Sequence, residues 1–157
     1  DSDMISAVVL FISAITVSNA CVPTSTPTTT TPCCSMLSQS TLPRRNPTIT
    51  TQQQCSVLQR VSSTCPVDGI VICAAAQETN PDNILIEFIN SAGVVVRSAN
   101  AAGSPATILS VKVVCINGVW KVPTTSAGTT YADIATVSCS QSGSTGTDLG
   151  YVMGTAV

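Results

Sequence analysis

The sequence predicts a small, disulfide-rich, all-β domain, folded as an antiparallel β-sandwich behind an N-terminal apolar segment and a Thr/Pro-rich linker. Three observations lead to this fold class. The chain has eight cysteines, its short β-branched runs are separated by turn residues, and no long helical period follows the apolar segment. Disulfides stabilise exported domains whose hydrophobic core is modest.

The first segment, residues 1–20, is expected to be a cleaved secretory signal peptide. Its apolar run from Met4 to Ala20 carries no charge and ends in small residues just before Cys21, as a signal peptidase requires. The run is short for a membrane span, which needs about 20 apolar residues. Residues 1–3 are interpreted as an upstream remnant. The alternatives are a retained hydrophobic anchor and a lipoprotein acylated at Cys21, although Ser18 stands where a lipoprotein needs a bulky aliphatic residue.

Residues 21–32 are expected to form an extended linker, because proline removes backbone donors and threonine resists helix. Ser and Thr beside proline are also typical of O-glycosylated stalks, and a plain disordered tail is the alternative. The rest of the chain, residues 33–157, is predicted to be the cysteine-rich β domain. Its dibasic pair Arg44-Arg45 lies between two prolines, which favours a solvated loop over a processing site.

The first strands are predicted from apolar runs bounded by turn residues. A run at 69–74 follows an Asp-Gly turn, and residues 84–90 alternate between two faces. A three-residue loop ending in glycine then leads to a second run at 94–97. This hairpin would place Glu87 opposite Arg97, a cross-strand pair of opposite charges.

The strongest local signal is Asn117-Gly118 between two β-branched runs. It matches a two-residue type I′ hairpin turn, because both central positions need positive φ. This turn pairs Cys115 with Trp120 on one face of the hairpin and leaves its two lysines on the other. We therefore expect Trp120 to be a core residue that covers the disulfide of Cys115; an exposed platform for ligand stacking is the alternative.

Two further strands, at 131–138 leading to Cys139 and at 150–156, complete a set of six or seven. That number suffices for a two-layer sandwich. The best helical candidate in the domain is Gln52 to Ser62, which could supply one or two turns.

All eight cysteines are expected in disulfides: Cys21, Cys33, Cys34, Cys55, Cys65, Cys73, Cys115 and Cys139. The adjacent Cys33 and Cys34 cannot easily bond to each other, so each should fasten a different part of the domain. Eight cysteines allow about 105 pairings, and the sequence leaves the pairing open. No metal site or cofactor is expected, because the chain lacks histidine and paired C-x2-C ligands.

Charge and residue types exclude several function classes. Six basic and eight acidic residues are scattered, without the basic stripe that nucleic-acid binding needs. After signal cleavage no membrane segment is expected, and the domain should be a monomer. The absence of histidine removes the usual general base and the Ser-His-Asp arrangement.

Catalysis would then need a carboxylate pair or a Ser-Lys dyad. The acids lie in no recognisable motif: Asp68, Glu78, Asp82, Glu87, Asp133 and Asp148. Lys112 and Lys121 are predicted to be exposed on the hairpin, which does not suit a desolvated base. We therefore expect a non-enzymatic protein, with a secreted hydrolase using a carboxylate pair as a less favoured reading.

The cysteine spacing resembles that of the six-cysteine extracellular domain of nematode secreted proteins. The resemblance covers roughly residues 33–139, and its most specific piece is Cys115-x-Asn-Gly-x-Trp120. It implies that one of the two adjacent cysteines, with Cys65, Cys73, Cys115 and Cys139, matches family cysteines, whereas Cys21 and Cys55 are additions. The family's first and third cysteines are thought to pair. Its function is unknown, so the resemblance implies an extracellular domain and no activity.

The leading functional hypothesis is a secreted binding or interaction module whose partner is an unknown extracellular protein or glycan. A rigid stapled sandwich presents its surface well and offers no chemistry. The alternative is a structural matrix or surface component on an O-glycosylated stalk. A contiguous exposed apolar patch would favour binding, and a uniformly polar surface would favour the structural role.

Overall fold

The computed structural model describes residues 32–54 and 56–146, which contain ten β-strands and no helix. The strands, in chain order, are β1 (Val57–Ser62), β2 (Asp68–Ala74), β3 (Thr79–Asn80), β4 (Asn83–Ile89), β5 (Val95–Ala102), β6 (Ile108–Ile116), β7 (Val119–Pro123), β8 (Tyr131–Asp133), β9 (Thr136–Ser142) and β10 (Thr145–Gly146). The predicted leader, nearly all of the linker and the predicted strand at 150–156 lie outside these residues. No helix among the described residues is long and apolar enough to span a membrane.

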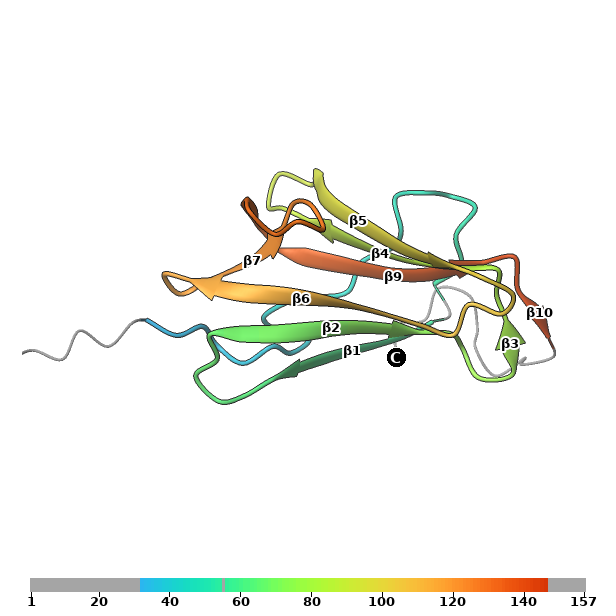
Figure 1. Ribbon diagram of the computed structural model, residues 1–157, viewed down its shortest axis with the longest axis horizontal. Coiled ribbons are helices and arrows are strands. Elements are labelled where there is room, and N and C mark those ends of the chain that lie inside the picture. The colour runs from blue at the N-terminus through green and yellow to red at the C-terminus, as the bar shows by residue number, and fades with distance from the viewer. Residues whose placement is uncertain (1–31, 55, 147–157) are drawn as a thin grey trace, which may run out of the picture. The chain divides into compact units, whose positions relative to one another are not determined.

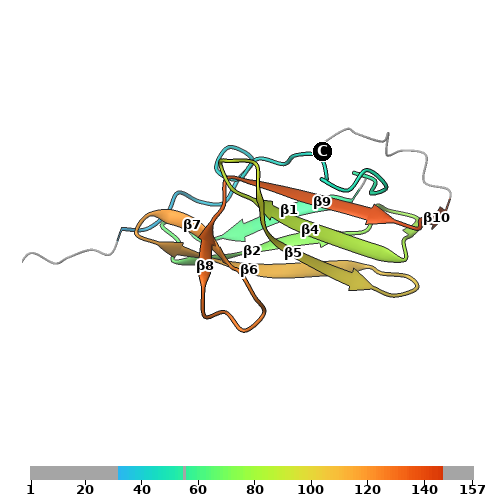
Figure 2. The same cartoon turned by 90° about the horizontal axis from the view of Figure 1, so that it is seen from above.

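The strands form two packed layers, and every strand pairing is antiparallel. One sheet has the order β1-β2-β6-β7-β8 and the other has the order β5-β4-β9, with a small β10-β3 ribbon at one end. In Figure 1 the strands β5, β4 and β9 lie above β6, β2 and β1. Figure 2 shows the same strands from above. The predicted all-β, disulfide-rich fold class is confirmed.

The core lies between the two sheets and is built by strand alternation. From β4, the side chains of Ile84, Ile86 and Phe88 point inward and are fully buried. They pack in one cluster with residues of the opposite sheet, including Val71 of β2 and Val113 of β6. Each large apolar side chain buried in this way contributes about 1.5–3 kcal/mol relative to an exposed position.

The β6–β7 hairpin has the predicted turn and register. Asn117 and Gly118 both have positive φ, 53° and 78°, as a type I′ turn requires. Cys115 lies opposite Trp120, so the two side chains share the inward face. This local prediction succeeded because a two-residue turn fixes the pairing of every residue beside it.

The β4–β5 hairpin departs from the predicted register by one residue. Gly93 has the expected positive φ of 79°, but a bulge shifts the pairing between Phe88 and Ile89. Phe88 therefore lies opposite Arg97, and Glu87 lies opposite Ser98. The predicted Glu87–Arg97 pair is wrong, because β5 carries one extra residue at the bulge.

Two other predictions need correction. The helical candidate at 52–62 instead ends in strand β1, which pairs with β2 along its whole length. The strand expected at 131–138 is interrupted where the chain crosses from one sheet to the other. Ile134 N–H donates to the Trp120 carbonyl at 3.1 Å, whereas Ala135 N–H donates to the Ile89 carbonyl at 2.8 Å. The preceding strand β8 therefore belongs to the five-stranded sheet and β9 to the three-stranded sheet.

Candidate functional site

Six of the eight predicted disulfide cysteines lie in the described residues, and they form three bonds. Cys33 bonds to Cys65, Cys34 to Cys115, and Cys73 to Cys139, with Cα–Cα distances of 5.0, 5.7 and 5.6 Å. Cys21 and Cys55 lie outside the described residues. The adjacent Cys33 and Cys34 are thus fastened to different segments, the loop before β2 and the end of β6.

The hairpin tryptophan lies beside one of these bonds. Trp120 is 7% exposed and belongs to the core cluster. Its Nε1–H donates to the Ser35 carbonyl at 2.9 Å, next to Cys34 in the chain. Residues 33–37, which we call the N-terminal arm, are bonded to Cys115 at this end of the sandwich, and Trp120 packs there. Its buried ring is not available as a ligand-stacking platform.

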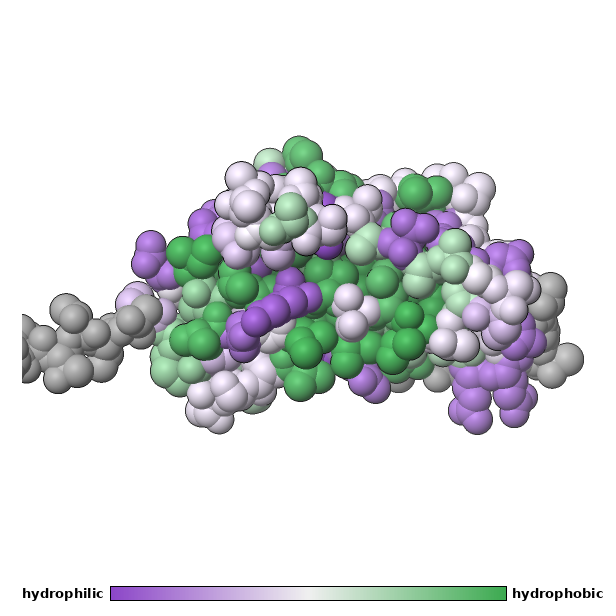
Figure 3. All heavy atoms as spheres, in the orientation of Figure 1, coloured by the Kyte–Doolittle hydropathy of each residue, from purple (hydrophilic) through white to green (hydrophobic). Residues whose placement is uncertain are grey.

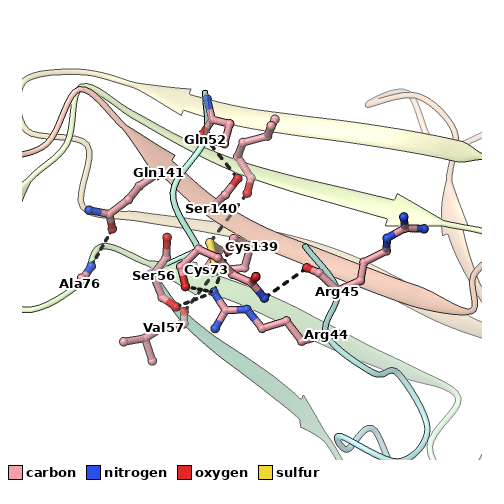
Figure 4. The surroundings of a disulfide bond; sticks show 12 residues. Arg44, Arg45, Gln52, Ser56, Val57, Cys73, Ala76, Cys139, Ser140 and Gln141 are labelled. Atoms are coloured by element: carbon pink, nitrogen blue, oxygen red, sulfur yellow. Dashed lines mark hydrogen bonds between the residues drawn. A yellow bond between two sulfur atoms is a disulfide. The ribbon is translucent and has the colours of Figure 1, made fainter. Parts of the chain in front are cut away.

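The third bond joins the two sheets. Cys73 comes from β2 and Cys139 from β9, and both side chains are fully buried. Arg44 reaches this region from the loop before β1, as Figure 4 shows, and its Nη2 donates to the carbonyls of Cys139 at 2.7 Å and Ser56 at 2.8 Å. The predicted solvated loop at Arg44-Arg45 is therefore wrong for Arg44, whose guanidinium is directed inward, although Arg45 is exposed.

The segment 43–54 lies along the free edge of β9 and contacts the outer face of β4 through Thr48. At one end Arg45 N–H donates to the Val137 carbonyl, and at the other Gln53 and Gln141 exchange backbone hydrogen bonds. Between these anchors, Thr48 N–H donates to a carboxylate oxygen of Glu87 at 2.9 Å, and the Thr48 hydroxyl donates to the other oxygen. Glu87 is only 3% exposed, and Thr48 of this loop supplies hydrogen bonds to both of its carboxylate oxygens.

A cavity of about 520 Å³ lies in the same loop, lined by Asn46, Pro47 and residues 49–54. These side chains include no acid, base or thiol. The cavity therefore offers amide and hydroxyl groups for hydrogen bonding but no acid or base for proton transfer. The carboxylate of Glu87 is not among its lining residues.

In contrast, the described residues leave the outer face of the five-stranded sheet uncovered. Its outward-pointing side chains include eight β-branched apolar residues on four adjacent strands, which we call the open face: Val57, Val61, Ile70, Ile72, Ile108, Val114, Ile116 and Val119. Ile108 is 59% exposed and Val61 is 50% exposed. Figure 3 shows hydrophobic side chains gathered over β2 and β6, crossed by a hydrophilic band.

Two lysine–aspartate pairs cross this face. Lys112 Nζ lies 2.8 Å from an oxygen of Asp68, and Lys121 Nζ lies 2.6 Å from an oxygen of Asp133. The hydrogen bond and the charge of Asp68 raise the pKa of Lys112 above its usual value. The open face therefore carries equal numbers of positive and negative side chains, each paired within the same molecule.

The sequence did contain a signal for this surface. The run Ile70-Val71-Ile72 is apolar at consecutive positions, so both faces of β2 must be apolar. The predicted strand at 69–74 was not assigned an inward or an outward face. Among the described residues, no group of three or more histidine, cysteine or acidic side chains could hold a metal ion.

No protein-family model, curated protein or solved structure matches this chain.

Proposed function

We propose that the chain is a secreted, non-enzymatic interaction module whose binding surface is the open face. The observation that carries this proposal is the gathering of eight β-branched side chains on four strands, one exposed on each strand (Val61, Ile70, Ile108 and Val119), in a domain closed by disulfides. Exposed apolar patches of this kind mark interaction sites. Disulfides persist mainly in oxidising compartments, which supports an extracellular location.

The chemistry of the face favours a protein over a glycan as the partner. Glycan sites use aromatic rings as stacking platforms, whereas the apolar side chains of the open face are valine and isoleucine. The exposed aromatic residue among the described residues of this sheet is Tyr131, which is 43% exposed on the edge strand β8. The apolar surface also favours binding over a purely structural spacer, for which a uniformly polar surface was expected.

A non-enzymatic role fits the residues that remain available for chemistry. The chain has no histidine. Asp68 and Asp133 are paired with lysines on the sheet surface, and Glu87 accepts hydrogen bonds from Thr48 under its loop. The carboxylate pair needed for hydrolysis has no candidate in these positions.

We also propose kinship with the six-cysteine extracellular domain of nematode secreted proteins. The proposal rests on the element Cys115-x-Asn-Gly-x-Trp120. The third matched cysteine, Cys73, bonds to Cys139 and not to the first one, so the disulfides lend this kinship no support, and it adds no activity.

The proposal is tested by expressing the full chain in a secretory eukaryotic cell line and analysing cells and medium separately. Mass spectrometry of the medium is expected to find a chain that begins at Cys21. The apolar dye ANS should fluoresce with this folded material, and less so with an Ile70→Ser/Ile108→Ser variant. Retention of the chain in the cells, or a dye signal that the variant leaves unchanged, would reject the proposal.

A further inference from the structure

We propose that Asn117, at the tip of the β6–β7 hairpin, is a modification site that deamidates in the folded protein through a cyclic imide formed with Gly118. The backbone nitrogen of Gly118 attacks the side-chain carbonyl carbon of Asn117. The new C–N bond closes a five-membered succinimide ring, and the carboxamide nitrogen leaves as ammonia with the proton of the Gly118 N–H. Water then opens the ring at either carbonyl, which gives aspartate or isoaspartate.

The turn leaves both reacting groups accessible. Asn117 and Gly118 are exposed. Among the described residues, the Asn117 side chain has no hydrogen-bond partner, and the Gly118 N–H donates to no carbonyl. A Cβ atom built on Gly118 would have one neighbour within 4 Å, Pro32 Cβ at 4.0 Å. The attack therefore breaks no hydrogen bond of these two groups and displaces no packed side chain.

The residue after the asparagine distinguishes this position from others in the chain. Asparagine is among the thermolabile residue types, but imide formation needs an N–H on the next residue. Asn46 and Asn80 both precede proline, which has no backbone N–H. Gly118 supplies the N–H and, having no side chain, does not crowd the attacking nitrogen.

The remaining asparagines in the described part of the chain are restrained by hydrogen bonds. Asn100 Nδ2 donates to Asn83 Oδ1 at 3.3 Å. Asn90 Oδ1 accepts from the N–H groups of Ala92 and Val94 at 3.0 and 2.9 Å. Each of these three asparagines also precedes a residue that carries a side chain. We therefore expect deamidation to be selective for Asn117.

The isoaspartate product does not fit the turn in which it forms. Its main chain runs through the former side chain, so one extra methylene separates residues 117 and 118. Loop length and turn type together determine the pairing of a hairpin. The register that places Cys115 opposite Trp120 would thus lose the two-residue turn that fixes it.

The new carboxylate also lies between two residues of the open face. Ile116 and Val119 directly flank the turn, and Val119 is 43% exposed. An ionised carboxylate resists the loss of water that apolar binding requires, so we expect deamidation to weaken binding at this end of the open face. This consequence rests on the proposed function, whereas the deamidation itself does not.

The test is incubation of the purified full chain, with its disulfides intact, at physiological temperature and slightly alkaline pH. Peptide mass spectrometry then follows each asparagine over time. Asn117 is expected to convert about tenfold faster, or more, than Asn83, Asn90 and Asn100. It should give two products, of which one is a substrate for an isoaspartyl methyltransferase.

Asn117→Gly is the matched control, because glycine also accepts the positive φ of this turn but has no amide to lose. Over the same incubation the melting temperature and the ANS signal of the wild-type chain should fall, while those of the variant stay constant. A constant ANS signal in a wild-type chain that has converted would reject the consequence for the open face.

Three results would overturn the deamidation site itself. The first is an Asn117 that stays intact in the folded chain although it converts after reduction and denaturation. The second is conversion of the other asparagines at the same rate. The third is aspartate without isoaspartate, because direct hydrolysis forms no imide. Retention of the chain in the cells would reject the proposed function and would not bear on these measurements.

Discussion

Glu87 illustrates how a single residue acquires a role that strand alternation does not indicate. Its position on β4 predicted a cross-strand pair with Arg97. The structure instead buries it under Thr48, while Arg97 donates to the carbonyls of Pro123 and Thr125 at 2.6 and 2.7 Å. Hydrogen bonds from Arg97 thus connect β5 to the end of β7 and the loop after it. Glu87 binds the segment 43–54 through Thr48.

We predict that Glu87→Ala lowers the free energy of unfolding by about 2 kcal/mol, because hydrogen bonds to charged groups contribute about 1.5–3 kcal/mol. Glu87→Gln should cost less, since its amide can accept from Thr48 N–H and donate to the Thr48 hydroxyl. Chemical denaturation measures both values. Ser98→Ala, on the neighbouring strand and exposed, is the control; equal losses for all three variants would contradict the role assigned to Glu87.

Lys112 provides a second test at a single residue. Its pKa is raised because Asp68 accepts a hydrogen bond from it and attracts its charge. A raised lysine pKa means that the pair stabilises the fold below about pH 10.5 and that this contribution is lost as the pH rises through the higher folded value. NMR titration should find that Asp68→Asn lowers the pKa of Lys112, whereas Asp133→Asn leaves it in place. A Lys112 pKa that does not respond to Asp68→Asn would exclude the pair in solution.

At the scale of elements, the packing of β2 against its neighbours depends on a glycine, Gly69. Gly69 lies where a Cβ atom would meet Leu37 Cδ1 at 2.5 Å and the Val61 carbonyl oxygen at 2.9 Å. The side chain of leucine can move, but the carbonyl belongs to the paired strand β1. The glycine therefore permits β1, β2 and the N-terminal arm to pack together.

We predict that Gly69→Ala lowers the free energy of unfolding by about 1–3 kcal/mol through overpacking. Gly103→Ala is the control, because the nearest atom to its new Cβ would be 3.7 Å away, an ordinary contact. Thermal melts of the two variants measure the difference. Equal melting temperatures would mean that β1 can shift to accept the methyl group.

The elements that the sequence predicted well are those determined by neighbouring residues. Asn117-Gly118 fixed the β6–β7 register, because the turn type depends on these two positions alone. The sequence did not reveal the β4–β5 bulge, the crossing at Ile134 or strand β1. Each of these depends on which strand the segment pairs with and in which register. The open face was not predicted for the same reason. The pattern of a strand does not show whether other segments of the chain lie over its outward apolar side chains.

At the scale of the whole molecule, the Cys73–Cys139 bond is the disulfide that joins the two sheets in the part of the chain that the structure describes. It joins residues 66 apart in the chain, and it lies among the carbonyls that accept from Arg44 (Figure 4). Closing a loop of this length stabilises the fold by about 4 kcal/mol through the entropy of the unfolded chain.

We predict that Cys73→Ala/Cys139→Ala lowers the free energy of unfolding by about 4 kcal/mol. The comparison variant Cys33→Ala/Cys65→Ala should lose less, because its loop is shorter, 32 residues, and Cys65 is exposed. Denaturant unfolding of both double variants measures the order. A larger loss for the Cys33–Cys65 pair would contradict the importance assigned to the bond between the sheets.

The central proposal is that this sandwich folds in an oxidising, extracellular compartment, where the three disulfides of its described residues fix the sheets and so present the open face. Peptide mapping of the secreted protein without reduction tests it most directly. The map should contain peptides linked through Cys33–Cys65, Cys34–Cys115 and Cys73–Cys139. Free thiols at these six positions, or a different set of linked peptides, would contradict the account.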